Sequence, residues 1–489
     1  MKKTTGKNVS VFLLGVLLVF SLFSGVSVEG RTGESLQYDL SGAWGGYLEL
    51  QGARLRIIFN LTKTGAGTYT ATLDSPDQGA KGIPVSSVLI DGDSIHIEVA
   101  VANGRFSAFH DHSNSVLDGT WFQSGMILPL VLSKDIDMPS DKKPQDPVSP
   151  YPYREEEIVF RNEDAGIDLA GTLTIPENSG VFPAVVLISG SGPQDRNEEV
   201  LGHRPFLVIS DHLTRKGIAV LRYDDRGVGG SSGDFSAATS VDFAGDARSA
   251  IEYLRSRGEI DRSAIGLVGH SEGGLIAPMI ASQKTNVSYI ILLGGPGLNG
   301  GDILLLQSEL IFMASGFEQD LVDRLMEQKR LEHSIILGEN NSALAKEKMI
   351  EASSAFLSSY TQDELVKIGY KPGIIEQRAD IYLTSWFRFF MSYDPAPAIS
   401  RLSCSVLALW GEKDLQVPPV ENISAIRKAL EAGGNSDYQL KVFPGLNHLF
   451  QHCDSGSPSE YASIAETFSP EVLDFISSWI LEKTGDTKH

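Results

Sequence analysis

Residues 265–274 read Ile-Gly-Leu-Val-Gly-His-Ser-Glu-Gly-Gly, an apolar run followed at once by a glycine-rich turn. The run has the composition of a buried parallel strand, and residues 274–282 have that of a helix. The turn matches Gly-x-Ser-x-Gly, with Gly269 and Gly273 where a Cβ atom would clash in a tight strand-to-helix connection. This nucleophile-elbow pattern predicts that Ser271 is presented at the tip of the turn.

Similar apolar runs lie on both sides of this stretch, and helix-like segments such as 241–257 and 424–432 separate some of them. Buried parallel strands are short and continuously apolar, and their alternation with helices is typical of a doubly wound α/β sheet. The strands we expect are 184–188, 218–221, 265–268, 290–293 and 406–409.

A serine hydroxyl becomes a good nucleophile only when a base takes its proton and an acid orients that base. Asp414 follows one later apolar strand, and His448 follows the next. The order Ser271, Asp414, His448 is that of α/β-hydrolases, so these residues are the predicted catalytic triad. Glu412 and His452 are weaker candidates, because Glu412 is nearer the strand end and His452 lies beyond the expected loop position.

Acyl transfer also needs donors for the oxygen that becomes negative in the tetrahedral intermediate. One donor is expected to be the backbone N–H of Glu272, the residue after the nucleophile. The other is expected in the glycine-rich loop 189–193, where we predict the backbone N–H of Ser191. The alternative for that loop is a simple turn.

Two charged pairs lie in loops near this predicted site, Asp195 with Arg196 and Asp225 with Arg226. A charged pair at the end of a strand can contact substrate. The adjacency of opposite charges favours a second interpretation, in which each pair holds its own loop by an internal ion pair.

The strand–helix alternation stops at about 298 and resumes at about 398. The stretch between is rich in Leu, Met, Glu, Lys, Ala and Gln at helical spacing, which predicts a helical lid inserted into the hydrolase domain. Near its end lie Trp386-Phe-Arg-Phe-Phe390 and Tyr393. These aromatic residues either form the wall of an acyl pocket or pack the lid on the core.

The region before the hydrolase domain has a different pattern. Residues 28–135 alternate in the manner of strands, and Leu40-Ser-Gly-Ala-Trp44 is echoed by Leu117-Asp-Gly-Thr-Trp121. We expect a small all-β domain, a barrel or a sandwich, with its first and last strands side by side. A proline-rich linker, 136–152, follows, and the α/β-hydrolase domain is expected over 153–485.

Residues 1–27 contain three lysines, then an apolar run, then small residues. This is the order found in a secretory signal peptide, so we expect export to the periplasm or the medium. An uncleaved membrane anchor is the alternative, and it is the only membrane association we expect. Cys404 and Cys453, the only cysteines, are expected at opposite ends of a strand and therefore free.

The chain has 489 residues, 62 acidic against 41 basic side chains, and a net charge of −21. Nucleic-acid binding and attraction to anionic lipid both require clustered Lys and Arg. The charge balance therefore argues against nucleic acid as a partner. No oligomeric state is predicted.

Five motifs in the same order resemble the bacterial EstD-type esterase family over roughly residues 150–485. The resemblance implies a carboxylic ester hydrolase for short acyl chains with no metal or organic cofactor, and it places the triad on Ser271, Asp414 and His448. Ser189-Gly190 stands where His-Gly is usual. The motifs are Leu187-Ile-Ser-Gly-Ser-Gly-Pro-Gln-Asp-Arg-Asn197, Tyr223-Asp-Asp-Arg-Gly-Val-Gly229, Gly269-His-Ser-Glu-Gly-Gly274, Gly411-Glu-Lys-Asp-Leu-Gln-Val-Pro-Pro419 and Leu446-Asn-His448.

The leading prediction is therefore a serine carboxylesterase that acts on a small-molecule ester through an acyl-enzyme. The alternative is a serine peptidase or amidase of the prolyl-oligopeptidase or serine-aminopeptidase kind. A third hypothesis is a cell-wall or carbohydrate binding protein with a vestigial hydrolase domain, against which the complete triad argues.

Overall fold

The computed structural model describes residues 39–50, 53–65, 68–75, 80–102, 104–123, 126–134, 143–283, 287–370 and 373–485. The predicted signal segment 1–27 and linker residues 136–142 lie outside these ranges. The chain forms two compact units, one made of the strands up to residue 133 and one of the elements from residue 153 onward. Within the described ranges no helix has the length and apolar character needed to cross a bilayer.

The first unit is one antiparallel sheet with the strand order β4-β3-β2-β1-β9-β8-β7-β6-β5. Its first and last strands are neighbours, as expected, with Gly45 of β1 opposite Ser133 of β9. The second echoed motif, however, lies in β8, which is separated from β1 by β9. The strands are β1 (Gly42–Leu50), β2 (Ala53–Lys63), β3 (Tyr69–Ser75), β4 (Ala80–Pro84), β5 (Ser87–Asp91), β6 (Ser94–Val99), β7 (Gly104–Asp111), β8 (Val116–Gln123) and β9 (Met126–Ser133).

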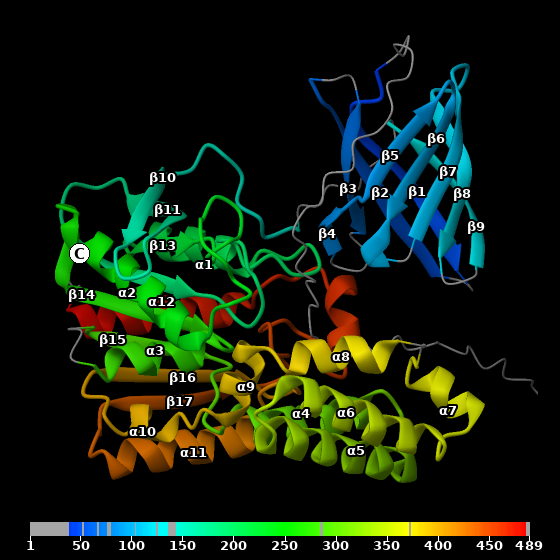
Figure 1. Ribbon diagram of the computed structural model, residues 1–489. Coiled ribbons are helices and arrows are strands. Elements are labelled where there is room, and N and C mark those ends of the chain that lie inside the picture. The colour runs from blue at the N-terminus through cyan, green and yellow to red at the C-terminus, as the bar shows by residue number, and fades with distance from the viewer. Residues whose placement is uncertain are drawn as a thin grey trace, which may run out of the picture. The chain divides into compact units, whose positions relative to one another are not determined.

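The strands of this unit enclose one apolar core. Trp44 and Trp121, the tryptophans of the two echoed motifs, are both buried there, together with Phe59 and Phe106. The edge strands β4 and β5 follow each other in the chain, so the sheet curls round this core (Figure 1). A single curled sheet corresponds to the barrel alternative.

The second unit is built on an eight-stranded sheet of order β10-β11-β13-β12-β14-β15-β16-β17. The strands from β12 to β17 are parallel, β11 is antiparallel to its neighbour β13, and β10 is antiparallel to β11. This is the mostly parallel α/β sheet that the sequence predicts. The strands are β10 (Tyr153–Asn162), β11 (Ile167–Pro176), β12 (Phe182–Ile188), β13 (Ala219–Tyr223), β14 (Ile260–His270), β15 (Tyr289–Leu293), β16 (Ser405–Gly411) and β17 (Tyr438–Phe443).

Helices cover both faces of this sheet and bury its apolar side chains in two cores (Figure 1). One face packs against α1 (Pro205–Arg215) and α12 (Pro470–Thr484). The other packs against α2 (Ser240–Ser256), α3 (Gly273–Ala281), α10 (Ala396–Ile399) and α11 (Pro419–Ala432). Two-sided burial explains the continuous apolar runs in the central strands, such as 184–188, 265–268 and 290–293.

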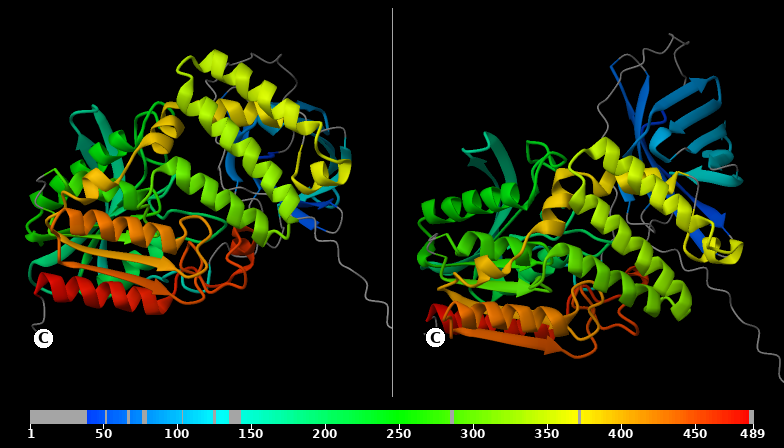
Figure 2. Two further views of the ribbon diagram at one scale, coloured as in Figure 1. Left: turned by 90° about the horizontal axis from the view of Figure 1, so that it is seen from below. Right: turned by 60° about the horizontal axis from the view of Figure 1, so that its bottom comes forward.

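The chain between β15 and β16 is helical, over the range predicted for the insertion. Its helices pack on one another through two small apolar cores (Figure 2). They are α4 (Gly300–Ala314), α5 (Gln319–Gly338), α6 (Ser342–Leu357), α7 (Gln362–Lys367), α8 (Ile374–Tyr382) and α9 (Ser385–Ser392).

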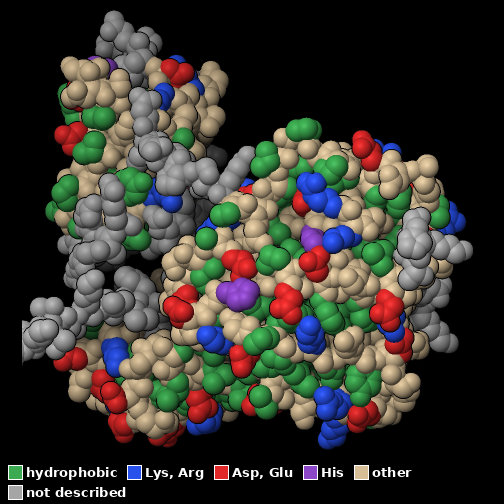
Figure 3. Space-filling view, turned by 180° about the vertical axis from the view of Figure 1, so that it is seen from behind, with side chains coloured by type: hydrophobic (Ala, Val, Ile, Leu, Met, Phe, Trp, Pro, Cys, Tyr) green, Lys and Arg blue, Asp and Glu red, His purple; other side chains and the backbone are tan. Residues whose placement is uncertain are grey.

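The distribution of charged side chains and the state of the two cysteines can be compared with what the sequence predicts. On the face drawn in Figure 3, acidic side chains are dispersed among basic ones, and the described residues there form no basic patch. Cys404 and Cys453 are both free, as predicted. Among the described residues, no three His, Cys, Asp or Glu side chains come together in the way that metal ligands do.

Candidate active site

The turn after β14 is as tight as the motif predicts. Ser271 has a left-handed backbone with φ of 51°, which reverses the chain between β14 and α3. A Cβ atom at Gly269 would lie 2.1 Å from the Gly273 carbonyl oxygen, and one at Gly273 would lie 2.1 Å from the Ile188 carbonyl oxygen. Both positions therefore require glycine. The Ser271 N–H donates to Leu293 of β15 at 2.8 Å, which fixes the turn to the sheet.

Asp414 and His448 meet at the carboxyl end of the sheet. Asp414 Oδ2 accepts a hydrogen bond from His448 Nδ1 at 2.8 Å, and both side chains are almost completely buried. The other oxygen, Oδ1, accepts from the N–H groups of Gln416 at 2.9 Å and Val417 at 2.8 Å. The carboxylate is therefore held at both oxygens, and it fixes the histidine so that Nε2 is the ring nitrogen left for other partners.

Ser271 belongs to the same cluster of loops. The ring of the preceding residue, His270, lies 4.9 Å from that of His448, centroid to centroid. Gly294, just after β15, has a φ of +58°, and a Cβ there would lie 2.9 Å from Cε1 of His448 and 3.3 Å from Oδ2 of Asp414. The turn that carries Ser271 and the loops that carry Asp414 and His448 thus lie at the same edge of the sheet.

The two predicted backbone donors are the N–H groups of Ser191 and Glu272. The neighbouring N–H of Gly190 is not a candidate, because it already donates to Glu198 Oε1 at 2.6 Å. Within the described part of the chain, no acceptor lies in hydrogen-bonding range of the N–H of Ser191 or of Glu272. Both amides therefore remain able to bind a substrate oxygen.

A second buried acid–histidine pair, Glu198 with His270, supports these loops, although the 72 positions that separate the two residues give no indication of their contact. Glu198 Oε1 also lies 2.9 Å from His270 Nδ1, while His270 Nε2 lies 3.2 Å from the carbonyl oxygen of His448. Burial disfavours the charged ring, but the carboxylate outweighs it and raises the pKa of His270. One carboxylate thus connects the Gly190 loop, the turn at Ser271 and the His448 loop.

The carboxyl group of Glu272 is also buried, with 2% of the residue exposed. Its Oε1 accepts from Ser240 Oγ at 2.5 Å and from Trp386 Nε1 at 2.8 Å. Burial raises the pKa of this group, against the opposing hydrogen bonds from Ser240 and Trp386. The side chain of a predicted backbone donor therefore contacts the helical insertion.

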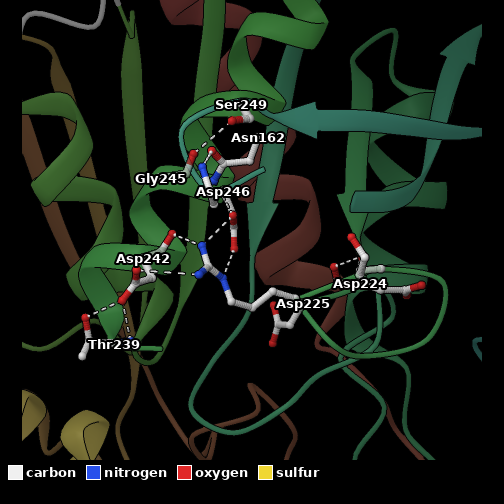
Figure 4. Close-up of polar contacts among 12 residues, drawn as sticks. Asn162, Asp224, Asp225, Thr239, Asp242, Gly245, Asp246 and Ser249 are labelled. Carbon is white, nitrogen blue, oxygen red and sulfur yellow. Dashed lines mark hydrogen bonds and ion pairs between the residues drawn. The ribbon is translucent and has the colours of Figure 1, made fainter. Parts of the chain in front are cut away.

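The expected ion pair between Asp225 and Arg226 is wrong. Arg226 binds Asp246 of α2 through two hydrogen bonds, from Nε at 2.8 Å and from an Nη at 2.9 Å (Figure 4). Asp225 instead accepts from the N–H of Gln194 at 2.9 Å and from Ser189 Oγ at 3.0 Å. The two residues lie at a turn after β13, where the Val228 N–H donates to the Asp225 carbonyl oxygen at 2.9 Å. Each side chain has its partner on a different segment of the chain.

The expected pair between Asp195 and Arg196 is also wrong. Arg196 binds Asp224 at 3.0 Å and 2.8 Å. Asp195 accepts from the backbone N–H groups of Asn197 and Glu199. Arg196 therefore joins the loop after β12 to the loop after β13, rather than closing its own loop.

The aromatic residues of α9 have packing roles. Phe390 is buried in the sheet core, and Trp386 stacks on it with ring centroids 5.6 Å apart. Phe387 is buried in the core of the insertion. Helix α9 thus packs both on the core of the sheet and on the core of the helical insertion. This supports the interpretation that these aromatic residues pack the insertion on the hydrolase core.

The model of the serine aminopeptidase S33 family of hydrolases matches residues 205–452, about half of the chain and all three predicted triad residues. The chain belongs to this family. Esterase EstD of Thermotoga maritima is 27% identical over 338 residues, which cover 69% of this chain and 70% of that protein. The predicted resemblance to the EstD-type esterase family is therefore confirmed.

Solved structures of similar proteins include two esterases. The Pyrococcus furiosus esterase PF2001 is 15% identical, with 68% of this chain and 91% of that chain covered and a TM-score of 0.39. Est1E of Butyrivibrio proteoclasticus, solved with ferulic acid, is 17% identical, with 67% and 99% covered and a TM-score of 0.39.

The position of Gly294 gives a direct test of the geometry. Gly294→Ala should lower hydrolysis of p-nitrophenyl acetate at least about tenfold, because the new methyl group displaces the His448 ring from Asp414. Gly434→Ala is the matched control, since Gly434 has a φ of +76° with nothing within 4 Å of its Cβ position. Both variants should lose about 1 kcal/mol of unfolding free energy from the left-handed backbone. Equal activity in the two would contradict this arrangement.

Proposed function

We propose that this protein is a serine-dependent carboxylic ester hydrolase that acts on short-chain acyl esters through an acyl-enzyme intermediate. The observation that carries the proposal is the buried Asp414–His448 hydrogen bond beside the turn that presents Ser271. The similarity to esterase EstD supports an ester as the bond that is cleaved.

In the proposed reaction, Ser271 Oγ attacks the ester carbonyl carbon and His448 Nε2 takes its proton. Asp414 holds Nδ1 and stabilises the charge on the ring. The proton then passes to the leaving alcohol, and the acyl group stays on Ser271. Water attacks the acyl-enzyme by the same route, which releases the acid and restores the serine.

The negative oxygen of each tetrahedral intermediate needs donors that are already in place. We assign them to the backbone N–H groups of Ser191 and Glu272, because both lack another acceptor. Loop geometry fixes these amides: Asp225 anchors the loop of Ser191, and Gly273 anchors the turn of Glu272. The proposed mechanism uses only side chains and amides of the chain itself.

Three substitutions test the triad. Ser271→Ala and Asp414→Asn should each lower kcat for p-nitrophenyl acetate at least about 1000-fold, since one removes the nucleophile and the other the group that orients its base. Glu412→Gln is the matched control, because the Glu412 carboxylate is exposed and only accepts from the Gly445 N–H. A Ser271→Ala variant with a tenth of the wild-type rate would end the proposal.

A serine aminopeptidase or amidase is the second candidate, because the matching family model carries that description. Esters and amides pass through the same intermediates but differ in the leaving group, since an amine must be protonated before it departs. The triad serves both reactions, so the site geometry does not separate them.

Matched substrates do separate the two. The kcat/KM for an alanine p-nitrophenyl ester should exceed that for alanine p-nitroanilide by more than the ratio of the spontaneous hydrolysis rates. The enzyme should hydrolyse p-nitrophenyl acetate as well, because an esterase does not require a free amino group on the substrate. Hydrolysis of the anilide alone would identify a peptidase.

We further propose that the helical insertion acts as a lid over the site, that residues 136–152 form a linker, and that residues 1–27 are a signal peptide. The order of lysines, apolar residues and small residues supports export. Expression of the full chain in a Gram-negative bacterium should release a periplasmic protein whose N-terminus lies near residue 28. A full-length chain retained in the membrane fraction would support the anchor alternative.

A further inference from the structure

The structure contains one contact between the turn at Ser271 and the helical insertion that the proposed reaction does not itself require. The carboxyl group of Glu272 lies directly after the nucleophile, and the residue is 2% exposed. A buried carboxyl group is costly unless hydrogen bonds replace its water. Its partners therefore reveal what the buried position is used for.

Two separate segments of the chain supply those partners. Ser240 is the first residue of α2 and donates at 2.5 Å, and Trp386 of α9 donates through its indole N–H at 2.8 Å. Glu272 thus joins the nucleophile turn to α2 and to the insertion through one carboxyl group.

Trp386 is placed to transmit the position of the insertion. Its ring stacks on Phe390 with an interplanar angle of 14°, and it meets Phe387 edge-on at 6.0 Å. Phe390 belongs to the sheet core and Phe387 to the core of the insertion. Thr384 caps this helix by accepting from the Phe387 N–H at 3.3 Å. A rigid, doubly packed helix therefore presents the indole N–H to Glu272.

We propose that Glu272 is a positioning residue whose side chain fastens α9 to the nucleophile turn and so holds its own backbone N–H in place. This inference rests on the proposed function, since that N–H is one of the two proposed oxyanion donors. Loss of the contact lets this amide drift. Because the oxyanion exists only after attack, the loss lowers kcat and leaves KM almost unchanged.

The test compares four variants with p-nitrophenyl acetate as substrate. Glu272→Met keeps the approximate length of the side chain but removes the hydrogen-bond acceptors. Trp386→Phe keeps an aromatic six-membered ring but removes the indole N–H. Each should lower kcat about tenfold or more, with KM within about threefold. Glu272→Gln should stay within about threefold of wild type, because its amide oxygen still accepts from the indole. The double variant Trp386→Phe/Glu272→Met should be no slower than the slower single variant.

Trp479→Phe is the matched control for the loss of an indole. Trp479 is buried in α12 against Tyr289, on the other face of the sheet. This variant should be less stable but keep the wild-type kcat. A Trp386→Phe variant that changes only KM, a double variant whose loss is the product of the single losses, or a Glu272→Gln variant as slow as Glu272→Met would each overturn the inference.

Hydrogen–deuterium exchange of residues 385–392 provides a readout that does not depend on activity. Exchange in α9 should be faster in Glu272→Met than in wild type and unchanged in Glu272→Gln. Equal exchange in all three proteins would also overturn the inference. Failure of the proposed function is seen separately, in the same assay, when Ser271→Ala hydrolyses the ester as fast as wild type.

Discussion

The site depends on how closely the backbone of the nucleophile turn approaches the end of β12. A Cβ at Gly273 would lie 2.1 Å from the Ile188 carbonyl oxygen, so the turn fits only with glycine there. Ile188 leads into the loop of Ser191, and Ser271 lies two residues before Gly273. One steric constraint therefore fixes the nucleophile and both proposed oxyanion donors relative to each other.

Buried carboxyl groups then attach the surrounding loops to this turn. Asp414 orients His448, Glu198 joins Gly190 to His270, and Asp225 holds the loop before Gln194. In each case a backbone N–H group is among the donors. Among the described residues, no Lys or Arg side chain forms an ion pair with any of these three carboxylates. Acidic residues outnumber basic ones by 62 to 41 in the whole chain, and some of that excess serves these internal contacts rather than the surface alone.

The features predictable from sequence are local in the chain or follow from strand order. The turn at Ser271 is read from ten consecutive residues, and Asp414 and His448 are found because each follows an apolar strand. The two parallel strands end at the same edge of one sheet, which places these side chains together. In the first unit, the first and last strands are neighbours as expected, although the echoed Trp121 lies in β8 and not in the last strand.

The features that escaped prediction depend on distant partners. Arg226 binds Asp246 rather than its neighbour, because the direction of a side chain is set by backbone geometry that sequence adjacency does not reveal. The contact between Glu272 and Trp386 joins residues 114 positions apart, on a turn and on an inserted helix. Nothing in the spacing of either residue indicates the other, and only packing brings them together.

The central claim is that Ser271 is an activated nucleophile served by His448. Its most direct test is mass-spectrometric mapping of the protein after reaction with a fluorophosphonate, which bonds covalently to an activated serine. We expect one adduct per chain, on the peptide that contains Ser271, and almost none in a His448→Gln variant of the same fold. An adduct on another residue, no adduct in the wild-type protein, or equal labelling of the variant would show that Ser271 is not a nucleophile activated by His448.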